Sequence, residues 1–394
     1  MATHDFDPAD VTANWGFPTS VRVGPGRLAE LASICNELGF TRPLVVTDPG
    51  VRDLPMIRDT LEALQAAGIE AALFSDVRGN PTGANVEAGV GVFRAGGHDS
   101  VIAFGGGSAL DAAKAVALMA GQERPLWDFE DIGDNWKRAN VAAIVPCIAI
   151  PTTAGTGSEV GRASVITNEQ SHRKMIIFHP RMLPLAVILD PETTLGLPPQ
   201  MTAATGMDAL SHCFEAWCAP GFHPMADGIA LEGLRLISSA LPRAYDDGSD
   251  IEARTQMLAA ASMGSTAFQK GLGAVHAISH PVGAFYQTHH GLTNAVVLPY
   301  VMRFNHAAIA ERMAPVAQAL GLLDTSFDAV FEWVLRFRER LGIPHTLADL
   351  GVDSNRADEI GRMGEIDPPA ATNPVPVTAA DLERVFVNAV EGRL

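Results

Sequence analysis

The sequence predicts two domains, an α/β domain followed by an all-helical domain. Three observations support this. The chain has 394 residues, which is long for one compact core and sufficient for two. Short apolar runs alternate with helical patterns in the first half. From Met201 onward, apolar residues recur at the three-to-four spacing of helices.

The first half alternates short apolar runs with amphipathic segments. The expected elements are strands at 43–48, 71–77, 100–108 and 145–155 and helices at 56–70, 84–98 and 109–121. Because strand–helix alternation implies right-handed crossovers, these strands should form a mostly parallel sheet.

The second half is predicted to be helical, with helices expected at 201–218, 225–245 and 251–271. The pattern changes at the paired prolines Pro198 and Pro199. We therefore expect domains at 1–197 and 198–394.

Charge and hydropathy exclude several classes of partner. The formal net charge is −17, and no Lys/Arg run offers a nucleic acid a basic patch. No stretch approaches the ~20 apolar residues of a membrane helix. The N-terminus has early acids and no apolar segment typical of a secretory signal. We expect a cytoplasmic enzyme that acts on small molecules, without nucleic-acid or membrane partners.

The four cysteines are predicted to be buried free thiols. None of Cys35, Cys147, Cys213 and Cys218 forms a CxxC pair. Cys213 follows His212, but adjacent helical side chains point about 100° apart, so one metal would rarely take both.

A glycine cluster follows the strand at 100–108. Gly105, Gly106 and Gly107 precede Ser108, where a helix is expected to start. Glycines let a backbone approach a phosphate closely, and a helix N-terminus offers N–H groups to it. Ser108 and Asp111 also resemble a capping box. The segment is not a GxGxxG fingerprint, so a tight turn without ligand remains open.

Two further loops follow strands. Asp48 ends the strand at 43–48, where a carboxylate can accept the ribose hydroxyls of NAD and repel the 2′-phosphate of NADP. The alternative is a turn-forming Asp before Pro49 and Gly50, which is a common arrangement and, for this residue taken alone, the favoured interpretation. The hydroxyl-rich loop at 151–159 includes Thr152 and Thr156, and ordinary loop chemistry is its alternative.

Histidine spacing in the second half indicates a metal site. Asp208 and His212 stand one helical turn apart, as do His276 and His280, and His290 follows one loop later. Four of the twelve histidines fall between 276 and 290. A lone buried histidine is usually a core residue, but clusters with an acid favour a divalent metal.

The types of ligand atom indicate which metals the site could hold and which reaction it could support. Nitrogen and oxygen ligands suit Fe(II), Zn(II), Co(II), Ni(II) or Mn(II). Such a metal lowers the pKa of an alcohol and polarises an aldehyde. Together with a dinucleotide loop, it implies hydride transfer.

These motifs resemble the iron-containing (group III) alcohol dehydrogenase family, which includes lactaldehyde, 1,3-propanediol and butanol dehydrogenases. The resemblance spans nearly the whole chain, from FGGGSALDAAK through ATGMDALSHCFEAW and GAVHAISHPVGAF to ATNPVPVT. It implies a dehydroquinate synthase-like fold, with an α/β dinucleotide-binding domain and an all-α metal-binding domain.

The resemblance also implies roles for single residues. The metal ligands would be Asp208, His212, His276 and His290. His280 would be the catalytic residue near the nicotinamide that relays a proton, and His289 has no assigned role. The cofactor-binding residues would be Asp48, Asn80, Gly106, Gly107, Ser108, Thr152, Thr156 and Lys174.

We therefore predict a metal-dependent oxidoreductase that moves a hydride reversibly between NAD(H), rather than NADP(H), and a small primary alcohol–aldehyde pair. Fe(II) is the expected metal, with Zn(II) or another divalent ion as the alternative. Relatives suggest a homodimer or larger homo-oligomer.

Arg162 stands beside Ala163, where some relatives carry a polar residue near the substrate. It is either a surface arginine or a reader of an anionic substrate. The second possibility keeps open a semialdehyde reductase or a hydroxyacid–oxoacid transhydrogenase. A lyase like dehydroquinate synthase and a non-catalytic nucleotide-binding protein match the motifs less well.

Overall fold

The computed structural model describes residues 13–15 and 19–394. The chain divides into two compact units. The first comprises the residues up to Thr153 together with Gly157–Gly196. The second comprises Ala154–Thr156 together with Leu197–Leu394. The segment for which we expected no secretory signal lies largely outside the described residues.

The first unit is built on a seven-stranded sheet with the order β1-β2-β9-β6-β5-β3-β4. The strands after β1 run parallel to their neighbours, and β1 is antiparallel to β2. Their bounds, in chain order, are Ala13–Trp15, Ser20–Val23, Pro43–Val46, Ala72–Phe74, Ser100–Gly105, Cys147–Pro151 and, for β9, Ala186–Leu189. The predicted parallel sheet is confirmed.

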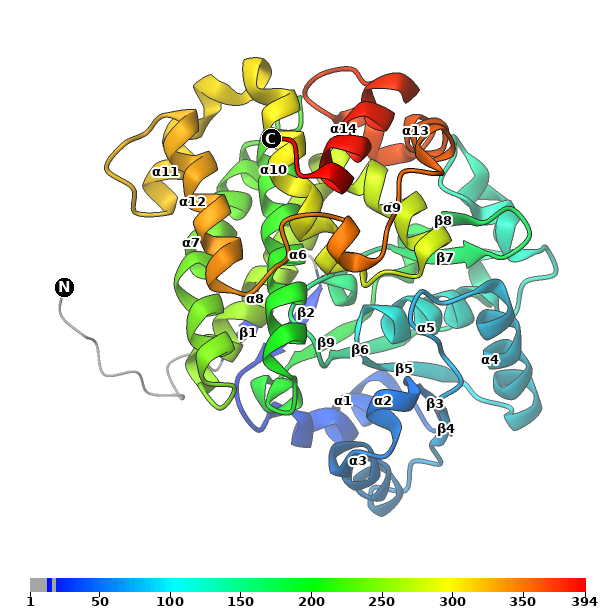
Figure 1. Ribbon diagram of the computed structural model, residues 1–394. Helices are drawn as coiled ribbons and strands as arrows, with labels where there is room; N and C mark the ends of the chain where they lie inside the picture. Colours follow the sequence, from blue (N-terminus) through cyan, green and yellow to red (C-terminus); the bar gives the residue numbers. More distant parts are fainter. Residues whose placement is uncertain (1–12, 16–18) are drawn as a thin grey trace. The chain divides into compact units, whose positions relative to one another are not determined.

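Helices cover both faces of this sheet, as Figure 1 shows. On one face, α1 (Leu31–Leu38) and α3 (Pro55–Ala66) pack against apolar strand residues such as Ile102 and Ile150. On the other, α4 (Gly83–Gly96) contacts β4, and α5 (Gly107–Met119) contacts β5 and β6. The central strands are buried throughout, which explains why they are short apolar runs without alternation.

The strand order reverses between β3 and β5. From β3 the chain moves outward to β4 on one side and then returns to β5 on the other. In open α/β sheets, ligands bind beyond the carboxyl ends of the strands at such a point. The residues after β3 and β5 therefore occupy the binding edge of this sheet.

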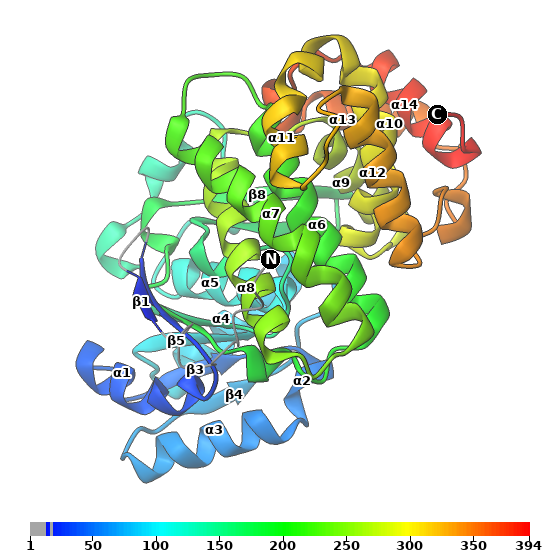
Figure 2. The same cartoon turned by 90° about the vertical axis from the view of Figure 1, so that its left-hand side faces the viewer.

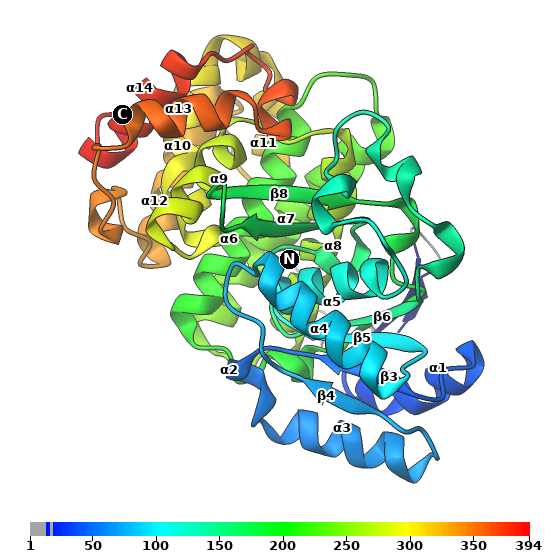
Figure 3. The same ribbon diagram turned by 90° about the vertical axis from the view of Figure 1, so that its right-hand side faces the viewer.

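An antiparallel hairpin, β7 (Ala163–Asn168) and β8 (Arg173–Phe178), was missed by sequence patterning, as were strands β2 and β9 and helix α1. Figure 3 shows the hairpin beside α5, and a buried lysine fastens it there. Lys114 Nζ donates to the carbonyl oxygens of Ser158 (2.9 Å) and Ala163. The neighbouring Asp111 accepts the Val165 N–H at 2.9 Å. Because these hydrogen-bond partners are distant in sequence, no local sequence pattern predicts the hairpin.

The second unit is helical. Its helices are α6 (Pro199–Cys218), α7 (Pro224–Asp246), α8 (Ile251–Ala267), α9 (Ala274–Tyr286), α10 (His290–Ile309), α11 (Met313–Ala319), α12 (Phe327–Arg340), α13 (Ala357–Glu365) and α14 (Ala379–Glu391). No helix in the described part of the chain is both long and apolar enough to cross a membrane.

Helix α6 is the centre of this unit, and α7 and α8 run beside it (Figures 1 and 2). Nearly all of its residues are buried. Three neighbours approach it through glycines. An added Cβ would lie 2.5 Å from Cys213 Sγ at Gly233, 3.1 Å from His212 Cβ at Gly264, and 2.4 Å from the Ala204 carbonyl oxygen at Gly291. The missing side chains let α7, α8 and α10 come close to α6.

We predict that Gly291→Ala destabilises the protein by about 1–3 kcal/mol, because a methyl group would meet backbone that cannot turn aside. Gly228→Ala is the matched control. Nothing lies within 4 Å of its Cβ position on α7, so it should be neutral or slightly stabilising. Urea unfolding of the metal-free proteins measures both, and equal stabilities would contradict the close-approach explanation.

Candidate metal centre and cofactor loop

Four side chains of the second unit converge on one point. Asp208 and His212 come from α6, His276 from α9 and His290 from the first position of α10. Each offers one ligand atom, and these atoms all lie within 4.8 Å of one another. The i and i+4 positions place the α6 pair on one face of that helix, while packing of α9 and α10 brings the other two.

The four side chains of the cluster are largely shielded from solvent. Asp208, His212 and His276 are each less than 5 % exposed, and His290 is half-buried. Burial lowers the pKa of His212 to about 4, so this imidazole is neutral at physiological pH. Burial also disfavours charge on His276, but the Glu215 carboxylate outweighs it, and the pKa of His276 is raised. A metal must therefore compete with protons at His276, and its binding should weaken as the pH falls.

Glu215 fixes the orientation of His276. Its Oε2 lies 2.5 Å from His276 Nδ1, and its Oε1 accepts the Val275 N–H at 2.8 Å. Because Nδ1 is engaged by the carboxylate, Nε2 is turned toward Asp208 and His290. A carboxylate behind a histidine in this way sets the tautomer and raises the basicity of the other ring nitrogen.

The residues fit a divalent metal. One carboxylate and three imidazoles are hard-to-borderline donors, which suit Fe(II) and Zn(II). Asp208 places a buried carboxylate in the cluster, and a bound cation would balance its negative charge. Convergence, burial and charge therefore agree.

Three neighbouring residues do not join the four. His280, one turn after His276, has its Nδ1 2.7 Å from Asp367 Oδ2 and stacks on the His290 ring. His289 caps α10, where its Nδ1 accepts the Leu292 N–H. Cys213 is turned toward Gly233 of α7. All four cysteines are free and buried, as predicted.

In the first unit, the glycine loop leads from β5 into α5. The helix begins at Gly107 with Gly106 as its N-cap, and no side chain caps it. The expected capping box between Ser108 and Asp111 is wrong. Ser108 already lies in the first turn, and Asp111 instead accepts bonds from Ser158 Oγ and the Val165 N–H. The first N–H groups of α5 thus lack a side-chain cap, which suits a bound anion.

Four predicted cofactor residues lie around this loop. A Cβ on Gly105 would be 3.1 Å from Asp48 Oδ2, so the carboxylate adjoins the glycines. The Asn80 N–H donates to Ser108 Oγ at 3.3 Å, and Lys174 Nζ donates to Asn80 Oδ1 at 2.7 Å. Asn80 adopts a positive φ of 55°. Asp48 is also the N-cap of α2 (Pro49–Arg52), where Oδ1 accepts the Gly50 N–H, so its turn-forming role is real as well.

The remaining predicted residues are more dispersed. Thr152 follows β6, is buried, and donates its N–H to the Gly105 carbonyl at 2.9 Å. Thr156 belongs to the short stretch that groups with the second unit. Arg162 is exposed and lies 5.8 Å from the centre of the Phe178 ring. It also lowers the pKa of Asp131, against a larger increase from burial.

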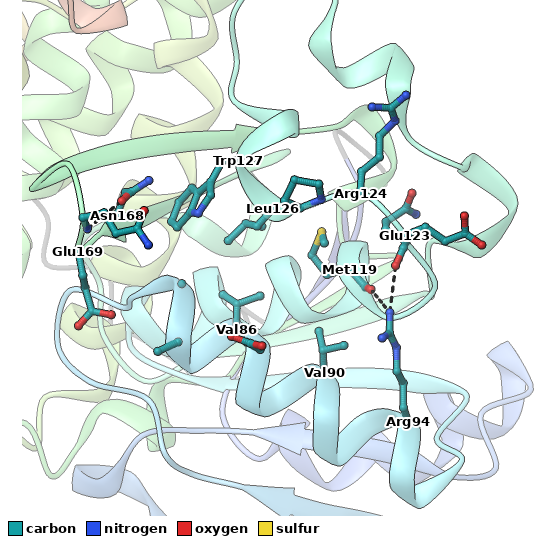
Figure 4. A pocket seen from close by; sticks show the side chains of 16 residues that line it. Val86, Val90, Arg94, Met119, Glu123, Arg124, Leu126, Trp127, Asn168 and Glu169 are labelled. Carbon is teal, nitrogen blue, oxygen red and sulfur yellow. Dashed lines mark hydrogen bonds between the residues drawn. The ribbon is translucent and has the colours of Figure 1, made fainter.

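A cavity of about 650 Å³ opens elsewhere in the first unit, between α4 and the segment at 122–127 (Figure 4). Val86, Val90, Leu126 and Trp127 form its apolar wall, and Arg94 lies at its edge. None of the predicted site residues lines it. Arg94 donates hydrogen bonds to the carbonyl oxygens of Ala120 and Gln122 and so stabilises the chain after α5.

Comparison with known proteins identifies the family. The model of the iron-containing alcohol dehydrogenases matches residues 18–191, and the model of the C-terminal domain of that family matches residues 202–390. The chain belongs to the iron-containing alcohol dehydrogenase family. The resemblance predicted from its motifs is confirmed.

Individual relatives agree with this assignment. A 4-hydroxybutyrate dehydrogenase of Cupriavidus necator is 40% identical, with 93% of this chain and 97% of the relative covered. The crystal structure of a 1,3-propanediol oxidoreductase superposes with a TM-score of 0.89 at 35% identity, covering 94% and 97%. The crystal structure of a sulfoacetaldehyde reductase of Bifidobacterium kashiwanohense in complex with NAD+ superposes with a TM-score of 0.84 at 30% identity. The match covers 96% of this chain and 98% of that one.

As a member of the family, the chain is a metal-dependent oxidoreductase that transfers hydride between NAD(H) and a small alcohol–aldehyde pair. The predicted fold, an α/β domain and a helical domain, is confirmed by the same matches.

Sequence reasoning missed three residues that hydrogen-bond to the predicted site: Glu215 contacts His276, Asn294 contacts Asp208, and Asp367 contacts His280. Glu215 stands three positions after His212 and thus on the same face of α6, a spacing that would have revealed it. Asn294 stands one turn after His290 on α10, with the same kind of signal. Asp367 gives no local signal, because it reaches His280 from a segment far along the chain.

We predict that Glu215→Gln weakens metal binding by about 10- to 100-fold without unfolding the protein. Glutamine has one acceptor oxygen for the two hydrogen bonds of Glu215, so His276 or the start of α9 loses its partner. Competition with a chromophoric chelator measures the affinity for Zn(II). Glu232→Gln, on the exposed face of α7, is the control and should bind like the wild type. An unchanged affinity in Glu215→Gln would show that the carboxylate does not support the site.

Proposed function

We propose that Asp208, His212, His276 and His290 hold one divalent metal, with Fe(II) the expected ion, and that this site activates a small primary alcohol for oxidation by NAD. The convergence of four ligand atoms within 4.8 Å carries the proposal. When bound, the metal stabilises negative charge on the oxygen of the substrate.

His280 is the proposed proton carrier. Its Nδ1 is engaged by Asp367, so Nε2 is the nitrogen that accepts or returns a proton. The Asp367 carboxylate behind the ring holds it in one orientation. Burial of His280 and Asp367 keeps bulk water from competing at the ring.

The cofactor roles follow the arrangement around the glycine loop. Gly106, Gly107 and Ser108 would receive the pyrophosphate at the start of α5, with Asn80, Lys174, Thr152 and Thr156 as further cofactor contacts. Asp48 would accept the adenosine-ribose hydroxyls and so favour NAD over NADP. Support comes from the short path between Asp48 and the glycines and from the Lys174–Asn80–Ser108 chain of hydrogen bonds.

We further propose that the enzyme works in the cytoplasm, in line with its composition, and that it forms a homodimer or larger homo-oligomer, as the family resemblance implies.

A ω-hydroxycarboxylate is the second candidate substrate class. The relative with 40% identity is a 4-hydroxybutyrate dehydrogenase, and the sulfoacetaldehyde reductase acts on another substrate that carries an acid group. Each pairs an alcohol or aldehyde carbon with an anion. Arg162 is exposed beside the hairpin and would be the residue that reads such an anion.

We predict that His276→Ala loses the bound metal and lowers kcat/KM by at least about 1,000-fold, because charge stabilisation at the oxygen is lost. The assay follows NADH oxidation with short aldehydes, using anaerobically purified enzyme with and without chelator. His306→Ala, an exposed histidine on α10, is the control and should keep both metal and activity. Full activity with stoichiometric metal in His276→Ala would remove His276 from the ligand set.

We predict that Arg162→Ala raises KM for 4-hydroxybutyrate by about 10-fold or more, the value of a lost charge-assisted hydrogen bond, and leaves 1-butanol unaffected. Kinetics with both alcohols provide the comparison, and Arg138→Ala, an exposed arginine of the same unit, is the control. Equal changes in KM for the two alcohols would show that Arg162 is a surface residue that does not bind the substrate anion. They would contradict the proposal of an anionic substrate.

A further inference from the structure

Asn294 is a fully buried amide on α10, one helical turn after His290. A primary amide in a protein interior needs partners for its two N–H donors and for its oxygen. Its surroundings therefore show what the amide is for.

The nitrogen of this amide faces the metal cluster. Asn294 Nδ2 lies 2.8 Å from Asp208 Oδ1, 3.1 Å from His276 Nε2 and 3.1 Å from His290 Nε2. Asp208, His276 and His290 are three of the four residues of the cluster. Asn294 thus contacts the ligand set more extensively than Glu215, which reaches His276 alone among the four.

The chemistry of these atoms decides which end of the amide points at them. Asp208 Oδ1 is an acceptor, and His276 Nε2 is an acceptor because Nδ1 of that ring is turned to Glu215. An amide oxygen in this position would face these two acceptors without donating to either. The orientation is held although Asn294 Oδ1 has no hydrogen-bond partner within the described chain. Hydrogen bonds donated by the amide nitrogen therefore determine the orientation of the Asn294 side chain.

Two N–H groups cannot point at all three of these atoms at once. The shortest contact is to Asp208, and an N–H donated to a carboxylate is stronger than one donated to a neutral ring. Ring nitrogens that ligate a metal have no lone pair left for the amide. The bond to Asp208 is thus the one that persists with metal in place.

We propose that Asn294 is a positioning residue for the metal, which it does not ligate: its amide holds the Asp208 carboxylate in the orientation that directs one oxygen into the cluster. This inference rests on the proposed metal site. A carboxylate on a short side chain can rotate and offer one or both oxygens. A fixed N–H at one oxygen restrains that rotation, so Asn294 sets both the affinity for the metal and the number of oxygens that bind it.

The test compares Asn294→Leu, which fills the space without a donor, and Asn294→Ala, which removes the donor without crowding. Ser211→Ala is the matched control, since Ser211 is a buried polar residue of α6 that bonds its own helix. Metal-free proteins are checked by circular dichroism and thermal melting. Zn(II) affinity is measured by competition with a chromophoric chelator, and Co(II) absorption reports coordination number.

We expect both Asn294 variants to bind Zn(II) about 10- to 100-fold more weakly and to show an altered Co(II) spectrum, with Ser211→Ala unchanged. If Asn294→Leu does not fold, Asn294→Ala gives the same comparison. Wild-type affinity in both variants would overturn the inference, and so would weaker binding with a wild-type Co(II) spectrum, because general loosening would then suffice. A wild type that binds no stoichiometric metal would instead overturn the proposed site itself.

Discussion

The structure of the second unit depends on a buried carboxylate. Asp208 is 2% exposed on the central helix of its unit, and burying an unpaired charge costs several kcal/mol. Within the described residues, Asn294 donates a hydrogen bond to it and two imidazole nitrogens lie 3.7 Å away. A divalent cation at the point where these groups converge would supply the missing positive charge. The metal would thus stabilise the helical unit and activate the substrate through one interaction.

Close helix packing makes this convergence possible. Gly291 lets α10 approach the backbone of α6, so that His290 comes within reach of Asp208. Glu215 ties the start of α9 to α6 and turns His276 toward the same point. Glycines also shape the predicted cofactor loop of the first unit. The glycines after β5 leave the start of α5 accessible to an anion beside Asp48. Each site is a place where missing side chains allow close approach of backbone.

The sequence predicted what depends on local pattern. Helical spacing paired Asp208 with His212, and strand–helix alternation predicted the parallel sheet. The sequence did not predict features that depend on long-range packing. These are the β7–β8 hairpin, which Lys114 holds in place, and the His280–Asp367 pair. The expected capping box failed for a local reason, because the helix starts one residue earlier than Ser108 and Asp111 is drawn to the loop at 158–165. Donors to ligand atoms, such as Asn294, look like ordinary core amides until the ligands are seen together.

The most direct test of this account is anomalous diffraction from crystals grown with Fe(II) under anaerobic conditions. The account predicts one strong peak per chain, about 2.0–2.3 Å from Asp208, His212 Nε2, His276 Nε2 and His290 Nε2. A peak elsewhere, or no peak in crystals of active enzyme, would contradict the claim that these four residues hold the catalytic metal.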